Sequence, residues 1–350
     1  MSGNYVAVQW NRQKRFYDGA LVLGVTLYLF LFEVLNKVFF PLVTDEILLM
    51  RAFGTAALIL LHVILCIGPL CRLHRGLLPL LYNRRHAGVT LFVLALAHAV
   101  LVVLTYHVGG DANPFVTILT GGGWAPSMVG VPFQALGFTA LVILFLMAAT
   151  SHDFWLANLT APVWKALHML VYVAYGLLVL HVSFGVLQAE VNPIYAGLLA
   201  MGGVVVVGLH WRAGRGEVAA DRPAAGTVDA EGYVDAGPVA DILEGRARVV
   251  CLTGERVAIF RYEGKVSAIS NVCQHQNGPL GEGKIVYGCV TCPWHGYQYQ
   301  PESGAAPPPF VERVPTFNVR VRGGRVWVHP RPNPPGTVVE PARWPEGGKP

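Results

Sequence analysis

Six long apolar segments constrain the fold of this 350-residue chain more than any other feature. We place these segments near residues 19–39, 47–70, 87–107, 128–150, 162–186 and 193–211. Each is close to the roughly 20 residues that a helix needs to cross a hydrocarbon core about 30 Å thick. One such run alone is compatible with a buried helix of a soluble protein. Six in series predict a six-helix transmembrane bundle.

The charged residues support this prediction and give it an orientation. Asp, Glu, Lys and Arg make up 13% of the chain, about half the share found in soluble domains. This excludes a disordered regulator, an ordinary cytosolic enzyme and a basic module that binds nucleic acid. The cations cluster at alternate helix ends and are almost absent from the opposite loops. The positive-inside rule then predicts a multi-pass, lipid-embedded protein of the inner (cytoplasmic) membrane, with both termini in the cytoplasm.

The pattern changes after the last apolar segment. Residues 212–232 are small, polar and interrupted by Pro and Gly, which predicts a flexible linker. Residues 233–330 contain short alternating stretches such as RVAIFRY and RVWVHP between Gly-containing turns, which predicts an all-β domain. Residues 331–350 form a Pro-rich tail, either packed on the rest of the chain or disordered. Residues 1–18 form a polar cytoplasmic segment before the helical domain, 19–211.

The sharpest chemical motif lies in the predicted β domain. Cys273 and His275 are separated by sixteen intervening residues from Cys292 and His295. Each short loop therefore supplies one thiolate and one imidazole, as a Rieske [2Fe–2S] centre requires for its two irons. The alternative is a structural Cys₂His₂ zinc site, whose ligands usually come in Cys–Cys and His–His pairs.

Histidines in the apolar segments are candidate haem ligands, since ionisable residues inside a membrane are functional candidates by default. His98 and His181 lie about 20 and 24 Å along helices that both start on the cytoplasmic side. They are thus at nearly one depth and predict one b-type haem held by two imidazoles. His168 lies about 20 Å below His181. Together with His62 it raises the alternative of a second haem.

The loops around the Cys–His motif, CQHQNGPLGEG and VTCPWHGYQY, closely resemble Rieske loops of the ferredoxin type associated with oxygenases. Rieske proteins of quinol–cytochrome complexes carry an additional disulfide-forming Cys in each loop. In this sequence Gly278 and Trp294 stand where those cysteines are expected. The resemblance implies a low-potential [2Fe–2S] cluster that accepts electrons from a reductase.

The stretches RRHAGVTLFVLALAH (Arg84 to His98) and LHMLVYVAYGLLVLH (Leu167 to His181) resemble the ferric-reductase-like transmembrane family. The closest resemblance is to the haem-binding membrane subunit of bacterial methionine sulfoxide reductase systems. This implies a six-helix haem b domain that carries electrons across the membrane. His98, His168 and His181 match haem-associated positions of the family, whereas His62 departs from the pattern of that closest subfamily. Many family members use a cytoplasmic flavin domain, in whose place this chain has the predicted Rieske domain.

These observations predict an oxidoreductase component for transmembrane electron transfer. A cytoplasmic reductase or ferredoxin would reduce the Rieske cluster, and electrons would pass through haem b to an unidentified acceptor at the outer face. Two alternatives remain open: a quinone-linked subunit, and an accessory or redox-sensing subunit of a larger respiratory complex. The role of Arg51, near the outer end of the second helix, is also open between binding a haem propionate and snorkelling to the interface.

Overall fold

The computed structural model describes residues 12–109, 112–120, 132–152, 155, 159, 161–189, 192–222, 226–275, 277–294 and 296–344. The chain divides into two compact units. The helical unit comprises Trp10–Cys71 and Asn83–Trp211. The β unit comprises Arg72–Tyr82 and Arg212–Pro350, together with the first nine residues. Each unit is described by itself below.

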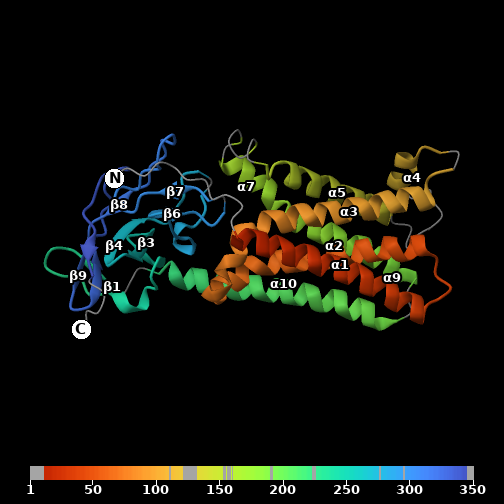
Figure 1. The fold of residues 1–350 in the computed structure, drawn as a ribbon, viewed down its shortest axis with the longest axis horizontal. Coiled ribbons are helices and arrows are strands. Elements are labelled where there is room, and N and C mark those ends of the chain that lie inside the picture. The colour runs from red at the N-terminus through yellow and green to blue at the C-terminus, as the bar shows by residue number, and fades with distance from the viewer. Residues whose placement is uncertain are drawn as a thin grey trace. The chain divides into compact units, whose positions relative to one another are not determined.

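The N-terminal part of the chain is helical, as predicted (Figure 1). Its α-helices are α1 (Arg12–Phe39), α2 (Asp45–Leu73), α3 (Arg84–Tyr106), α4 (Pro114–Thr120), α5 (Phe133–Ala149), α7 (Ala161–Met169), α8 (Val171–Phe184), α9 (Val186–Ala189) and α10 (Pro193–Ala220). A 3₁₀ helix, η1 (Arg75–Asn83), joins α2 to α3. The helices form because a backbone in hydrocarbon must satisfy its own hydrogen bonds.

The prediction of six spanning helices needs one correction. Within the described residues, five helical stretches are long and apolar enough to cross a membrane, and one of them runs through α7, α8 and α9 as Val163–Gln188. The segment predicted at 128–150 contains α5, which has 17 residues. At 1.5 Å per residue this helix is about 26 Å long, slightly less than the hydrocarbon thickness. Residues 121–131, which precede it, lie outside the described part of the chain.

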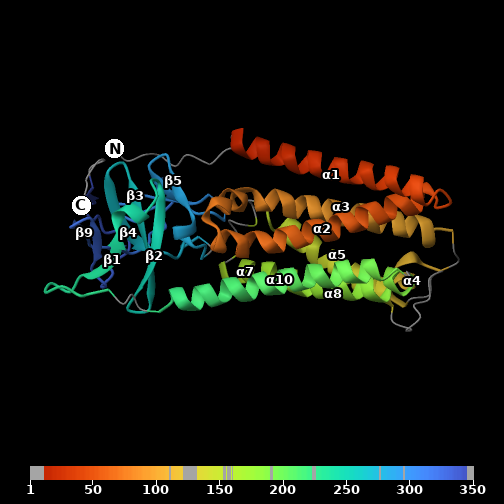
Figure 2. The same ribbon diagram turned by 90° about the horizontal axis from the view of Figure 1, so that it is seen from below.

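Small residues let the helices of the helical unit approach one another. Its core contains Ala56 and Ala57 of α2, Ala140 of α5 and Ala174 of α8, packed with leucines such as Leu61. Helix interfaces in membranes favour such small side chains. In both views α2 and α3 run side by side (Figures 1 and 2).

Helix α10 extends further than the sequence predicted. It begins at an Asn–Pro pair, where the Asn192 side chain accepts a 3.0 Å hydrogen bond from the Ile194 amide and Pro193 occupies the favoured first helical position. It continues to Ala220, so the first part of the interval predicted as a flexible linker, 212–232, is helical. The polar residues of this interval indicated a linker. In the structure Glu217 forms ion pairs with Arg72 and Arg256, which also belong to the β unit.

The β unit contains short antiparallel strands in three sheets, as the alternating stretches predicted. Its strands are β1 (Val234–Pro238), β2 (Arg246–Leu252), β3 (Glu255–Tyr262), β4 (Lys265–Ser270), β5 (Lys284–Val286), β6 (Cys289–Thr291), β7 (Gln298–Tyr299), β8 (Thr316–Phe317), β9 (Val319–Arg322), β10 (Arg325–Val328) and β11 (Ala342–Arg343). The sheet orders are β1-β10-β9, β11-β4-β3-β2 with β8 on β4, and β5-β6-β7.

The Pro-rich tail completes the second sheet. Strand β11 pairs with β4 through Ala342 and Val266, and the Trp344 amide donates a 2.7 Å hydrogen bond to the Gly264 carbonyl. Of the two fates considered for residues 331–350, the described part of the tail is packed. The fold of the β unit therefore extends past 330, the boundary placed from sequence.

Candidate functional site

Two loops with one backbone design carry the predicted cluster ligands. The first follows β4 and the second connects β6 to β7. In the first loop the Cys273 amide donates to the Gly278 carbonyl (2.9 Å), and the Asn277 amide donates to the Cys273 carbonyl (2.7 Å). In the second, the Cys292 amide donates to Tyr297 (2.7 Å) and the Gly296 amide donates to Cys292 (2.9 Å). Each cysteine thus starts a turn closed by the fourth and fifth residues after it.

The sequence permits this turn at the same point of both loops. The fourth residue after each cysteine has a left-handed backbone, with φ of 58° at Asn277 and 74° at Gly296. Glycine and asparagine are the residues that adopt this region most readily. In the first loop His275, which is partly exposed, lies between the two ends of this turn.

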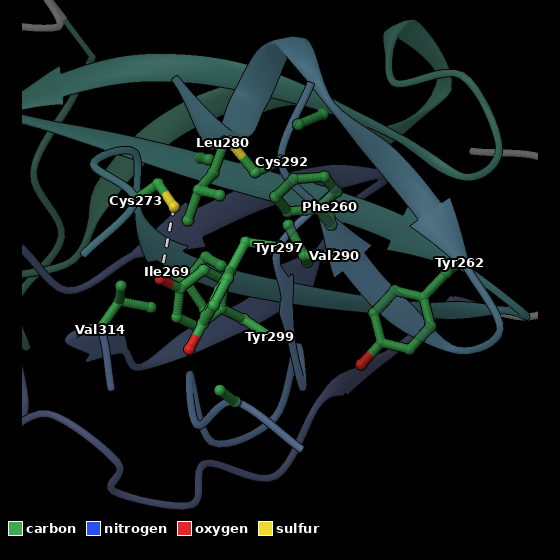
Figure 3. Close-up of a cluster of buried hydrophobic side chains, with 13 residues drawn as sticks. Phe260, Tyr262, Ile269, Cys273, Leu280, Val290, Cys292, Tyr297, Tyr299 and Val314 are labelled. Atoms are coloured by element: carbon green, nitrogen blue, oxygen red, sulfur yellow. Dashed lines mark hydrogen bonds between the residues drawn. The ribbon is translucent and has the colours of Figure 1, made fainter. Parts of the chain in front are cut away.

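Both cysteine side chains are buried in the same core cluster. Cys273 and Cys292 are each 1% exposed and pack with residues such as Leu280. Neither forms a disulfide. Figure 3 shows the two cysteines at the same end of this cluster. Cysteines that form no disulfide can bind iron as thiolates, as the cysteine ligands of a [2Fe–2S] cluster do.

The Tyr299 hydroxyl contacts the first of these sulfurs. Its oxygen lies 3.4 Å from Cys273 Sγ, as the dashed line in Figure 3 shows. The same oxygen accepts a 3.0 Å hydrogen bond from the Gln274 amide. Burial raises the pKa of Tyr299, which keeps the phenol protonated. Its proton is therefore available to Cys273.

Gly278 and Trp294 pack against each other. They stand where Rieske proteins of quinol–cytochrome complexes have their disulfide-forming cysteines. A side-chain carbon at Gly278 would lie 2.6 Å from Cys292 Sγ and 3.3 Å from the Trp294 ring. The absence of a side chain at Gly278 thus leaves space beside the sulfur, and Trp294 closes this space. With two buried thiols and an imidazole on two matching loops, the residues fit a [2Fe–2S] cluster.

A second tyrosine lies against the predicted imidazole ligand. The rings of His275 and Tyr297 are stacked at 4.8 Å with an angle of 6° between them. The Tyr297 hydroxyl donates to the Glu312 carboxylate. Tyr297 also packs against Phe310 at 5.0 Å. These contacts hold the His275 ring in one plane.

His295, the fourth predicted ligand, lies outside the described residues. Its neighbours Trp294 and Gly296 belong to the second loop, in which His295 is the third residue after Cys292, whereas His275 is the second residue after Cys273. Among the described residues, no group of three His, Cys, Asp or Glu side chains forms a site for a single metal ion.

In the helical unit, the structure brings together two of the four predicted haem ligands. The rings of His98 on α3 and His181 on α8 lie 6.4 Å apart at 82° to each other. Two imidazoles that bind one metal through bonds of about 2 Å have ring centres roughly 6 Å apart. The prediction that these residues share one depth therefore agrees with their contact.

The rings of His98 and His181 are positioned in the same way, each by a backbone carbonyl and a glycine. His98 Nδ1 lies 2.9 Å from the Met50 carbonyl, and His181 Nδ1 lies 2.8 Å from the Phe133 carbonyl. Four residues after each carbonyl stands a glycine whose absent side chain makes room for the ring. A Cβ at Gly54 would lie 2.9 Å from His98, and one at Gly137 would lie 2.7 Å from His181.

This arrangement fits a haem. Histidines that bind a metal usually donate the other ring N–H to a carbonyl, which fixes the tautomer and leaves Nε2 for the metal. Both rings here have their Nδ1 committed to a neighbouring helix, so Nε2 is the nitrogen left for a shared iron. His98 and His181 would hold the group.

The other two predicted haem ligands are placed differently. His62 Nδ1 contacts the Leu58 carbonyl of its own helix (2.8 Å), and its Nε2 lies 3.1 Å from the Tyr175 hydroxyl. His168 Nδ1 likewise contacts a carbonyl of its own helix (3.0 Å), and its ring stacks on Trp164 at 3.8 Å. The described contacts do not join these two histidines to each other.

Three residues of these sites were not predicted from the sequence: Tyr299, Gly54 and Gly137. Tyr299 stands in the VTCPWHGYQY stretch quoted above, seven residues after Cys292, but its contact with Cys273 depends on how the β5-β6-β7 sheet packs against the loop that follows β4. The two glycines carry a weak signal in the sequence, because glycine weakens a helix interior and needs a packing reason there.

Replacing Tyr299 with phenylalanine is expected to lower the reduction potential of the cluster by a few tens of millivolts. A hydrogen bond to a ligand sulfur stabilises the more negative, reduced state. A bond worth about 1 kcal/mol corresponds to roughly 40 mV, since 59 mV is a tenfold change for one electron. An EPR-monitored redox titration measures this shift. Tyr262→Phe is the control, because the hydroxyl of Tyr262 bonds to Ser267. Equal potentials for wild type and Tyr299→Phe would contradict the role of the hydroxyl.

Two family comparisons match the chain in succession. Residues 53–179 match the ferric reductase-like transmembrane component. Residues 232–318 match the Rieske [2Fe–2S] domain. Both resemblances stated from the sequence are thereby confirmed at the level of the family. The closer likeness to the membrane subunit of methionine sulfoxide reductase systems stays a prediction.

Individual relatives match only part of this chain. The ferredoxin component of the alkene monooxygenase system of Xanthobacter autotrophicus is 32% identical over 103 residues, which are 29% of this chain and 84% of that protein. Cholesterol 7-desaturase nvd of Xenopus laevis is 38% identical over 76 residues, which are 21% of this chain and 17% of the desaturase. The chain thus spans about a sixth of the desaturase's length.

Solved structures also match. The ferredoxin of carbazole 1,9a-dioxygenase from Nocardioides aromaticivorans is 26% identical, with a TM-score of 0.27, and the match covers 28% of this chain and 98% of that ferredoxin.

Proposed function

The chain joins a ferric reductase-like transmembrane domain to a Rieske [2Fe–2S] domain, and we propose that it carries electrons from a cytoplasmic donor to an acceptor at the outer face of the inner membrane. The route runs from the Rieske cluster to haem b. The observation that supports it best is the presence of two sites in one chain: the paired loops of Cys273 and Cys292, and the facing rings of His98 and His181. When bound, each group takes up and releases one electron at a time.

The chain's own residues account for much of this role. Cys273, His275, Cys292 and His295 would hold the cluster, and the Tyr299 hydroxyl, 3.4 Å from Cys273 Sγ, would donate to that sulfur as a thiolate. In the membrane, Met50 and Phe133 orient the two imidazoles through their carbonyls. His168 and His62 are the pair for a second haem, if the chain holds two.

The direction and the partners follow from charge and from the relatives. The arginines at the ends of α2, α3 and α10 support a cytoplasmic location of these ends and of the Rieske domain through the positive-inside rule. A ferredoxin or a reductase is then the natural donor, since the relatives include ferredoxin components of oxygenase systems. The outer acceptor is not identified by these features.

Rapid mixing of the full-length protein with a reduced ferredoxin-type donor tests the route. We expect cluster reduction to precede haem reduction, and Cys292→Ala to abolish haem reduction by that donor. The matched control is Cys289→Ala, which removes a buried thiol three residues away. Haem reduction at the wild-type rate in Cys292→Ala would overturn the order.

A further inference from the structure

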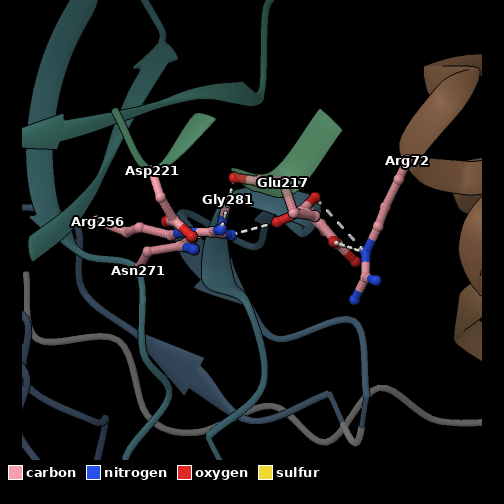
Figure 4. A network of polar contacts seen from close by, with 7 residues as sticks. Arg72, Glu217, Asp221, Arg256, Asn271 and Gly281 are labelled. Carbon is pink, nitrogen blue, oxygen red and sulfur yellow. Dashed lines mark hydrogen bonds and ion pairs between the residues drawn. The ribbon is translucent and has the colours of Figure 1, made fainter. Parts of the chain in front are cut away.

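A connected group of charged side chains lies at the base of the first cluster loop, all of it within the β unit. Figure 4 shows this group, which we call the loop clamp. It consists of Arg72 at the end of α2, Glu217 near the end of α10, Asp221, Arg256 on β3 and Glu282 in the 3₁₀ helix Leu280–Glu282. These residues come from four separate parts of the sequence.

Arg256 is the centre of the clamp. Its Nε donates a 2.6 Å hydrogen bond to Asp221, and its Nη1 donates to the Glu217 carboxylate. A further bond of 3.3 Å reaches the Glu217 carbonyl. Arg256 thus binds both the last turn of α10 and the residue that follows this helix. The hydrogen bond with Arg256 lowers the pKa of Asp221, so both groups carry their charges at neutral pH.

Arg72 extends the clamp to the far end of the loop. Its Nε lies 3.3 Å from Glu282 and 3.7 Å from Glu217. Glu217 is therefore shared between two arginines. Glu282 comes two residues after Leu280, with which the loop returns to the core.

Asn271 connects the clamp to the loop itself. Its amide donates 2.9 Å to the Arg256 carbonyl, and its own carbonyl accepts 2.8 Å from the Leu280 amide. Its side-chain oxygen accepts a 2.7 Å bond from the Gly281 amide. Asn271 is 5% exposed. The buried side chain of Asn271 thus links the start of the loop to its end. The Arg256 carbonyl, which accepts the hydrogen bond from the Asn271 amide, fixes the backbone of Asn271.

We propose that Asn271 and Arg256, held by Glu217, Asp221 and the Arg72–Glu282 pair, are positioning residues for the loop that carries Cys273 and His275. The inference rests on the proposed role of Cys273 and His275, both in this loop, as ligands of the cluster. Isolated surface ion pairs contribute little, but networks with shared partners contribute more. Arg256 and Glu217 are 29% and 31% exposed, so the clamp remains sensitive to salt.

Hydrogen exchange of the Leu280 and Gly281 amides tests the proposal directly, because both amides donate to Asn271. In the full-length protein with bound cofactors, the double variant Glu217→Gln with Asp221→Asn is expected to speed their exchange about fivefold or more. About 1 M salt, where the Debye length is about 3 Å, is expected to act in the same direction on the wild type. The control is Asp241→Asn, which breaks the 2.7 Å pair with Arg248 on β2 and leaves the loop intact.

Two further readouts separate positioning from general stability. The EPR lines of the reduced cluster are expected to broaden in the double variant and to stay sharp in Asp241→Asn. Arg72→Glu is expected to speed exchange, and its combination with Glu282→Arg to reverse this effect in part, because the swapped pair re-forms while Glu217 loses its contact with Arg72. Unchanged exchange and unchanged line widths in the double variant would overturn the proposal. Neither readout involves an electron donor or haem reduction, so failure here is distinguishable from failure of the proposed electron route.

Discussion

Cys292→Ala is expected to remove the cluster entirely, with a loss of about two iron and two acid-labile sulfide per chain. Cys292 is 1% exposed inside the core. Among the described residues of this core cluster, the other cysteine is Cys273, which is itself a predicted ligand. No neighbouring thiolate in the cluster can therefore replace Cys292. Haem content is expected to stay at the wild-type level, because the haem ligands belong to the other unit. Chemical analysis together with reduced-state EPR measures both quantities.

A second variant is also expected to lower the cluster content, although it removes no predicted ligand. Gly278→Val fills the space beside Cys292 Sγ, where even a Cβ would lie 2.6 Å away. We expect strongly reduced cluster content in this variant, whereas Cys289→Ala keeps the full content. A complete Rieske signal in Gly278→Val would show that the space beside the sulfur is not needed.

His98→Ala and His181→Ala are each expected to abolish haem binding at the shared site, while the cluster signal is kept. The two rings face each other at 6.4 Å, so loss of either removes one of two axial ligands. The pyridine haemochrome spectrum of purified protein gives the haem count. If the chain binds two haems, one is expected to remain in these variants and to be lost in His168→Ala. Full haem content in both His98→Ala and His181→Ala would contradict the pairing.

Gly137→Ala tests how the rings are positioned. Its Cβ would lie 2.7 Å from His181 Nδ1 and would push the ring from the Phe133 carbonyl. Loss of such a supporting bond costs about 10- to 100-fold in affinity at metal sites. The matched control is Gly176→Ala on α8, where a Cβ meets no atom within 4 Å. Haem titration into the apoprotein compares the two. Equal affinity would show that the glycine is not required.

The helices and the cluster loops were predictable because both are specified locally. Apolar length fixes a membrane helix, since its backbone has no other hydrogen-bond partners in hydrocarbon. The predicted segment 87–107 and the observed α3 (Arg84–Tyr106) agree for this reason. The cluster motif was equally local, because each loop holds its Cys and His within four residues. The end of α10 was not predictable, because Arg256 and Arg72, the partners of Glu217, are distant in the sequence.

The sequence by itself determined the two classes of site and their candidate ligands. The apolar segments, the charge asymmetry and the Cys–His spacing depend on residue type and separation along the chain. Only the tertiary structure distinguished His98 and His181 from His62 and His168. All four are histidines in apolar helices, but only the first two direct Nδ1 to a carbonyl of a neighbouring helix. Likewise, only the folded chain brings Tyr299 to Cys273 and Arg256 to Glu217. Such contacts depend on distances between residues far apart in sequence, which helix packing and strand register set.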